Sequence, residues 1–171
     1  MPFAYYDRLT RGQQRVYRKS DDIASVPIPR ADALRPLVEA VSEALAAEDR
    51  ARLQMTADRL LAEIALLLRV RPLRTRILAV RPSHRWGELH GLYNGASGGR
   101  VARVSVWTRM AQRHQVVRFR TFLRTLLHEL CHHLDYELLR LPDSFHPDGF
   151  YRRESSLLRQ LAPRAEGEEA S

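Results

Sequence analysis

Apolar residues recur at helical spacing in two stretches in the first half of the chain, residues 34–45 and 53–68. Apolar side chains three and four positions apart share one face of a helix, so both stretches predict amphipathic helices that pack on a core. Asp32 precedes the first stretch and is a candidate cap. Pro72 follows the second stretch and is expected to end its helix.

In the middle of the chain, apolar residues tend to recur at every second position, which is the spacing of a β-strand. Residues 74–80 partly alternate between polar and apolar side chains, and residues 101–107 alternate cleanly. Residues 86–93 read as a further strand, which leads into the glycine-rich turn N-G-A-S-G-G at 94–99. This order predicts a small, antiparallel-rich sheet that contains a hairpin.

Helical spacing returns in the last third of the chain. Residues 119–134 carry a long apolar stripe, and a loop with two prolines follows at 142–147. A last helix is expected to begin near Asp148 and to reach Leu161. The pattern therefore predicts the α+β class: N-terminal helices, a small sheet, a long helix and a C-terminal helix.

Three segments differ in composition along the 171 residues. Residues 1–30 form a basic, tyrosine-containing arm, which we expect to pack on the domain surface, with contact to a partner as the alternative. Residues 31–162 predict a single domain with its own core. Residues 163–171 are polar and are expected to be a disordered tail.

Net charge is +8, and Lys19 is the one lysine among 28 basic residues. Such a charge is typical of proteins that bind nucleic acid or other polyanions. The strong preference for arginine over lysine also fits a composition bias of the genome. DNA contact through the basic surface therefore stays open as a second interpretation.

Composition also bears on the compartment. No apolar run approaches the roughly 20 residues that cross a bilayer, and residues 1–8 lack the apolar stretch of a signal peptide. Cys131 is the single cysteine, so an intrachain disulfide is excluded. These features predict a cytoplasmic protein without a membrane partner; the oligomeric state is left open.

The chemistry is concentrated in residues 128–132, which read H-E-L-C-H. On a helix, residues four apart lie one above the other, so His128 and His132 can bind one metal ion. Glu129 is next to the first ligand, where it can act as general base toward a metal-bound water. This spacing predicts a zinc site.

A catalytic zinc site needs a third protein ligand. The longer motif that places this ligand six residues after the second histidine is excluded, because Leu138 occupies that position. Glu154 in the last helix and His146 in the preceding loop are the two candidates. We favour His146, because a side chain in a loop just before the helix can reach back to the metal.

H-E-L-C-H-H followed by H-P-D-G-F-Y at 146–151 resembles the SprT-like (Spartan-type) zinc metallopeptidases. The resemblance covers roughly residues 55–160, with Phe150 at the family's aromatic position four residues after the third histidine. Several members carry a C-terminal ribbon built on four cysteines, which this sequence does not contain. The chain therefore resembles a minimal form of the family.

The resemblance implies a zincin-like fold in which Zn²⁺ is bound by His128, His132 and His146, with Glu129 as general base. It further implies hydrolysis of peptide bonds in a protein or peptide substrate. The alternative is a basic nucleic-acid-binding protein with a structural, non-catalytic zinc site. A metal-dependent hydrolase acting on another bond is a third option.

Residues near the motif have more ordinary interpretations. Asp135 lies one turn past His132 and can accept the other N–H of that imidazole, with an ordinary exposed carboxylate as the alternative. Cys131 is expected to be buried and apolar, and His133 to be a packing or surface histidine.

Two further roles are predicted for the proposed reaction. Residues 101–107 are expected to be an edge strand that pairs with an extended peptide. Tyr136, Tyr151 and His133 are the candidates for stabilising an oxyanion.

Overall fold

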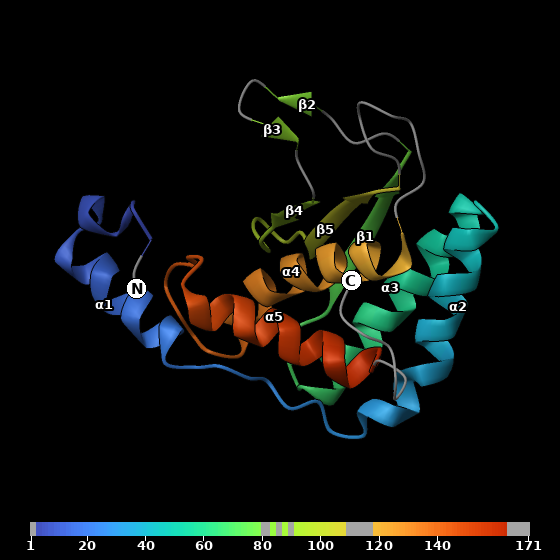
Figure 1. The fold of residues 1–171 in the computed structure, drawn as a ribbon, viewed down its shortest axis with the longest axis horizontal. Helices are drawn as coiled ribbons and strands as arrows, with labels where there is room; N and C mark the ends of the chain where they lie inside the picture. The colour runs from blue at the N-terminus through green and yellow to red at the C-terminus, as the bar shows by residue number, and fades with distance from the viewer. Residues whose placement is uncertain (1–2, 80–82, 85–86, 89–90, 109–117, 164–171) are drawn as a thin grey trace.

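The computed structural model describes residues 3–79, 83–84, 87–88, 91–108 and 118–163 of the chain. Five α-helices and a three-stranded mixed sheet confirm the α+β class (Figure 1). The elements are, in chain order, η1 (Tyr6–Arg8), α1 (Arg11–Asp21), η2 (Ala31–Leu34), α2 (Arg35–Ala46), α3 (Arg50–Leu67), β1 (Leu73–Leu78), β2 (Ser83–His84), β3 (Gly87–Glu88), β4 (Gly91–Asn94), β5 (Ala102–Trp107), α4 (Phe119–Glu137) and α5 (Asp148–Leu161). Among the described helices, none is long and apolar enough to cross a membrane.

The main sheet has the strand order β1-β5-β4, and β2 and β3 form a separate antiparallel pair. β4 and β5 form the predicted hairpin, but β1 runs parallel to β5. The prediction of an antiparallel-rich sheet is therefore wrong for β1. The chain leaves β1, passes through β2 and β3 and returns along β4, so β5 enters between β4 and β1 in the direction of β1. The expectation that residues 101–107 form an edge strand is also wrong, because β5 is central.

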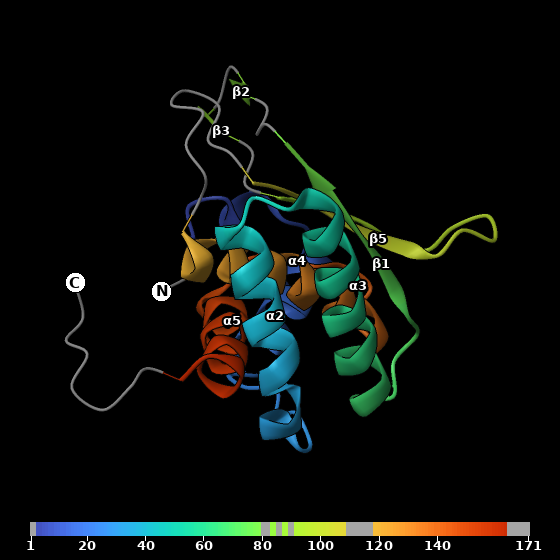
Figure 2. The same cartoon turned by 90° about the vertical axis from the view of Figure 1, so that its right-hand side faces the viewer.

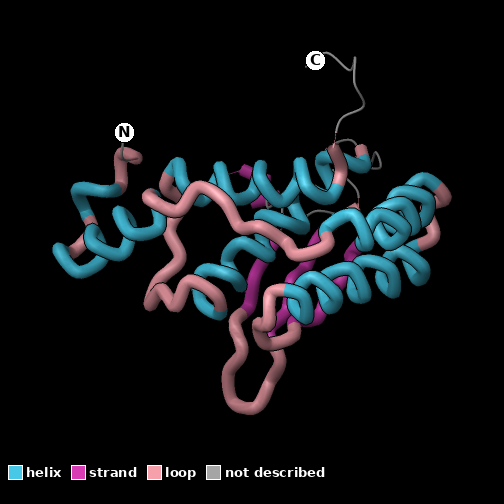
Figure 3. Tube along the Cα trace, turned by 90° about the horizontal axis from the view of Figure 1, so that it is seen from below, coloured by secondary structure: helices cyan, strands magenta, loops and turns pink. Residues whose placement is uncertain are grey.

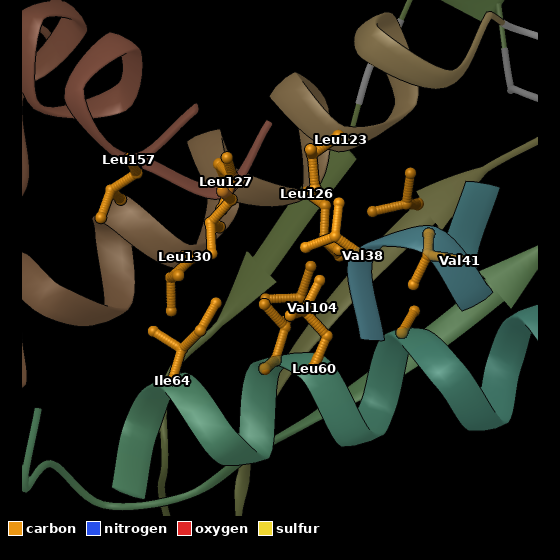
Figure 4. Packing of buried hydrophobic residues seen from close by; sticks show 14 of the residues in the cluster. Val38, Val41, Leu60, Ile64, Val104, Leu123, Leu126, Leu127, Leu130 and Leu157 are labelled. Carbon is orange, nitrogen blue, oxygen red and sulfur yellow. The ribbon is translucent and has the colours of Figure 1, made fainter. Parts of the chain in front are cut away.

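Helices cover one face of the sheet. Leu73 and Ile77 of β1 lie in register with Ala102 and Val106 of β5, and these side chains are buried. Since successive side chains in a strand point to opposite faces, they share one face, against which α3 and α4 pack (Figure 2). Leucines, valines and isoleucines from α2, α3, α4, α5 and β5 fill the space between the layers (Figure 4).

Both predicted helices in residues 34–68 are present as α2 and α3, with a different start for the first. α2 begins at Arg35 with a proline in its first turn, and no side chain caps it. Asp32 lies in η2 instead, so its prediction as the cap is wrong. Asp49 caps α3 by accepting a hydrogen bond from the backbone N–H of Arg52 at 3.0 Å.

The N-terminal arm contains α1, a helix that the apolar pattern did not predict. Thr10 and Gln13 form a reciprocal capping box at its start. The linker that follows runs along α5 toward η2 (Figures 1 and 3). There the Gln160 side chain accepts from Ile28 N at 2.8 Å and donates to Val26 O at 2.9 Å. These hydrogen bonds join the end of the arm to α5. Residues 164–171 of the predicted tail lie outside the described residues.

Candidate metal centre

The structure brings three predicted ligands together from two elements. His128 and His132 lie one turn apart on α4, and His146 lies in the loop before α5. One ring nitrogen from each lies within 4.8 Å of the other two, and the Nε2 atoms of His132 and His146 are 3.1 Å apart. Tetrahedral zinc with Zn–N bonds of about 2.0–2.1 Å places two such nitrogens roughly 3.3 Å apart. The three histidines could therefore hold a metal ion such as Zn²⁺.

A carboxylate orients the first histidine. Nδ1 of His128 donates to Oε2 of Glu154 at 2.8 Å, which leaves Nε2 of the ring free for a metal. Oε1 of Glu154 accepts from Arg124 Nη1 at 3.0 Å. Glu154, the alternative third ligand, is thus buried and engaged with the ring of His128, while His146 joins the histidine cluster.

A serine orients the second histidine. Ser144 Oγ donates to Asp135 Oδ2 at 2.7 Å and accepts from Nδ1 of His132 at 2.7 Å. Asp135 therefore does not contact His132 directly, so the predicted direct hydrogen bond is wrong. The alternative of an exposed carboxylate is also wrong. The carboxylate is completely buried and also accepts from Arg153 Nη2 at 3.1 Å. Burial raises the pKa of the Asp135 carboxyl, an effect that Arg153 opposes.

Burial also keeps two of the histidines neutral in the metal-free protein. It lowers the pKa of His132 to about 3 and that of His146 to about 4, with nearby histidines as a second cause. A metal ligand must present an unprotonated nitrogen, so these low values suit both rings to metal binding near neutral pH.

Glu129 lies between the histidines and the sheet. The residue is 6% exposed, and burial raises the pKa of its carboxyl to about 7, although His128 acts in the opposite direction. Gly91 of β4 makes room for it: a Cβ on Gly91 would lie 2.9 Å from both Cγ and Oε1 of Glu129. Sequence reasoning missed Gly91, although a glycine inside a strand is a known sign of a close approach.

These side chains open into a cleft of about 1160 Å³. The three histidines and Glu129 line it, together with Gly91, Leu92 and Tyr93 of β4. The lining also includes aromatic and basic residues from other elements: Phe119, Tyr136, Tyr151, Arg118, Arg120 and Arg124. Phe150 is fully buried, with ring centroids 5.0, 4.8 and 4.9 Å from those of His128, His132 and His146. The cluster thus rests on an apolar ring and faces an open space.

His133 does not belong to the cluster. Its Nε2 donates to Arg71 O at 2.7 Å, so Nδ1 accepts from the Tyr93 hydroxyl at 2.9 Å. Both ring nitrogens are occupied and the residue is completely buried, so of the two expected positions, packing and surface, His133 has the packing one. Cys131 is buried as predicted. The side chains of the remaining three histidines lie outside the described residues.

The loop of His146 also contacts the N-terminal arm. The backbone N–H of His146 donates to the Tyr5 hydroxyl at 3.0 Å. Neither this contact nor the role of Ser144 had a local sequence signal, because both join segments that only the fold brings together.

Comparison of the chain with protein-family models, with curated proteins and with solved structures gives no match.

Proposed function

We propose that the protein is a zinc-dependent metallopeptidase with the zincin-like arrangement of the SprT-like family. The convergence of His128, His132 and His146 beside a buried glutamate, at the wall of an open cleft, carries this proposal. Three histidines suit zinc in ligand type and number, and catalytic zinc sites use three protein ligands and keep one position open. The side chain of His128 is 25% exposed, which fits a site that a substrate can reach.

Bound zinc would supply a Lewis acid that polarises the scissile carbonyl and acidifies water. Glu129 would accept the proton of the attacking water and return it to the leaving amine. Burial raises the pKa of Glu129 in the metal-free protein, and a carboxylate with a raised pKa is a stronger base toward a water proton. The buried position of Glu129 next to the cleft therefore supports its role as general base.

The substrate would bind along β4. β4 is an edge strand of the three-stranded sheet, and Gly91, Leu92 and Tyr93 line the cleft. Free backbone groups of an edge strand can pair with an extended peptide. In this proposal β4, and not residues 101–107, is the edge strand that pairs with the peptide. The proposed substrate is an extended segment of an unfolded protein.

Two of the three predicted oxyanion stabilisers fit the proposal. Tyr136 and Tyr151 both line the cleft. The Tyr151 ring lies 6.1 Å from the ring of His128 and 6.0 Å from that of His146, measured between centroids. His133 is unsuited, because both of its nitrogens bond inside the domain.

Nucleic-acid binding is the second candidate function. Arg118, Arg120 and Arg124 are among the residues that line the cleft, and the net charge is +8. Binding that rests on arginine–phosphate contacts weakens steeply as salt rises. A protein with a purely structural zinc would bind DNA in this salt-dependent way and cleave no peptide; a peptidase that also binds DNA would do both.

Cleavage of a labelled unfolded protein tests the proposal. Wild type should cleave it, a chelator should stop cleavage and added zinc should restore it. Glu129→Gln should retain zinc and lose roughly 100-fold or more of the rate, since general base catalysis is worth about that much. Glu137→Gln is the matched control, because Glu137 lies on the same helix and binds Arg71 instead. Unchanged cleavage by Glu129→Gln, or cleavage indifferent to metal, would refute the proposal.

A further inference from the structure

Residues 3–23, here called the N-terminal brace, lie against the loop that carries His146. The Tyr5 hydroxyl accepts a hydrogen bond from the His146 backbone N–H at 3.0 Å. The Tyr17 ring packs on Phe145 at 6.2 Å and on Tyr5 at 5.9 Å, measured between centroids. The brace thus holds both the backbone of the His146 loop and the neighbouring ring.

The brace is also fixed to the start of α5. The backbone N–H of Gly149 donates to Asp21 Oδ1 at 2.8 Å. A Cβ on Gly149 would overlap the backbone of Asp21, so the end of α1 can pack this closely on α5 only because residue 149 has no side chain. Gly149 is three residues after His146, and this contact fixes the other end of the short segment that carries the third histidine.

A buried arginine connects the brace to the second histidine. Arg153 is 1% exposed; its Nη1 donates to Ile23 O at 2.6 Å, and its Nη2 to Ser20 Oγ at 2.7 Å and Asp135 Oδ1 at 3.1 Å. Asp135 in turn accepts from Ser144, whose Oγ meets Nδ1 of His132. A continuous line of hydrogen bonds therefore runs from the end of α1 to His132.

We infer that the N-terminal brace completes the metal centre by positioning two of its three ligands, with Tyr5, Gly149 and Arg153 as positioning residues. The inference rests on the metal binding of the proposed function. Ordering a free loop on metal binding would cost conformational entropy, whereas a loop that is already held in place avoids that cost. The brace is thus part of the site, although the sequence shows it only as a basic arm.

Zinc affinity of the full chain tests the inference at Tyr5. Tyr5→Phe keeps the ring and removes the hydroxyl that meets His146, so zinc should bind about 2- to 10-fold more weakly, the usual worth of one hydrogen bond. Tyr6→Phe is the matched control, because it removes the neighbouring hydroxyl while its ring, like that of Tyr5, packs on Tyr17. Its zinc affinity should equal that of wild type.

A second pair of variants tests the docking of α1. Gly149→Ala should push α1 away from α5 and weaken zinc binding about 10-fold or more, in the range seen for groups that support metal ligands. Gly12→Ala is the control within α1, since a Cβ there meets nothing closer than 3.8 Å. Alanine is the better helix former at both positions, so intrinsic helix propensity cannot explain a difference between them.

The measurements are zinc dissociation constants by competition, the visible spectrum of the cobalt-substituted protein, and urea unfolding of the metal-free protein. A purely structural brace would lower the unfolding midpoint and leave the zinc affinity of the folded protein and the cobalt spectrum unchanged. If Tyr5→Phe and Gly149→Ala bind zinc as tightly as their controls, the inference is refuted while the metal centre stands. If Gly149→Ala does not fold, the Tyr5 pair decides. Wild type that binds no zinc refutes the proposed function itself.

Discussion

Glu154 Oε2 accepts a hydrogen bond from Nδ1 of His128 at 2.8 Å, which turns the opposite nitrogen of that ring toward His132 and His146. A carboxylate bound to the outer nitrogen of a ligating histidine fixes its tautomer and raises its basicity. The sequence offered Glu154 as a rival to His146 for the third ligand position. In the structure the two residues have different roles: His146 belongs to the histidine cluster, and Glu154 binds the outer nitrogen of His128.

Replacement of Glu154 by leucine should distinguish a residue that orients His128 from a residue that binds the metal. The His128 ring would lose its acceptor, and zinc should bind about 10- to 100-fold more weakly. Saturating zinc should still fill one site per chain, because the three histidines are intact. Equilibrium dialysis against buffered zinc checks both numbers, with Glu137→Leu as the control on α4. A zinc affinity equal to that of the control would contradict the orienting role.

Gly91→Ala should damage the reaction without removing the metal. The new Cβ would lie 2.9 Å from Cγ and Oε1 of Glu129 and displace the carboxylate. Zinc content should stay at the wild-type level, and cleavage of an unfolded protein should fall at least about 10-fold, part of what general base catalysis contributes. Gly95→Ala is the control, because its Cβ would meet the Tyr93 ring at 3.9 Å, an ordinary contact. Equal rates for the two variants would show that Gly91 does not position Glu129.

Ser144→Ala should weaken both the zinc site and the fold. The change leaves Nδ1 of His132 and one oxygen of the buried Asp135 without their partner. An unsatisfied buried polar group costs about 1–3 kcal/mol, so the free energy of unfolding should fall by about that amount. Ser144→Thr keeps the hydroxyl and should recover most of the zinc affinity. Urea unfolding and zinc competition check the pair; a threonine variant no better than alanine would contradict the hydrogen-bonding role.

The metal-free protein should lose stability as pH falls from about 6.5 to 4. Its His132 and His146 have pKa values of about 3 and 4 against an ordinary 6.5, so the unfolded chain binds more protons in this window. Glu129 has the opposite effect on stability. Its pKa is about 7 in the folded protein against an ordinary 4.5, so between these values the folded state binds more protons than the unfolded chain. Glu129→Gln removes that opposing effect and should steepen the loss. Urea midpoints at several pH values check this; equal pH dependence in variant and wild type would contradict it.

Local patterns predicted most of the helices. The apolar stripes of residues 34–45, 53–68 and 119–134 correspond to α2, α3 and most of α4, because burial of one helix face requires that period. α1 lacks such a stripe, but Thr10 and Gln13 had the spacing of a capping box, which could have revealed it. The parallel pairing of β1 with β5 had no local signal, since it depends on the path of the intervening chain.

The candidate metal centre also combines features that have a local sequence signal with features that depend on the fold. The i, i+4 spacing of His128 and His132 is a local property, and His146 was inferred from its place before the last helix. Their supporting residues come from distant segments: Ser144 lies twelve positions after His132, and Tyr5 lies 141 positions before His146. Only packing brings such pairs together, so spacing along the chain could not predict them.

Zinc content of wild type and His146→Ala, measured together after equilibration with zinc and removal of the excess, tests the account most directly. Three histidines at the distances described predict one zinc ion per wild-type chain. His146→Ala should fold, because the side chain lies at the cleft, and should hold zinc at least about 10-fold more weakly. A wild-type protein without bound zinc, or a His146→Ala variant that binds it as tightly as wild type, would contradict the three-histidine centre.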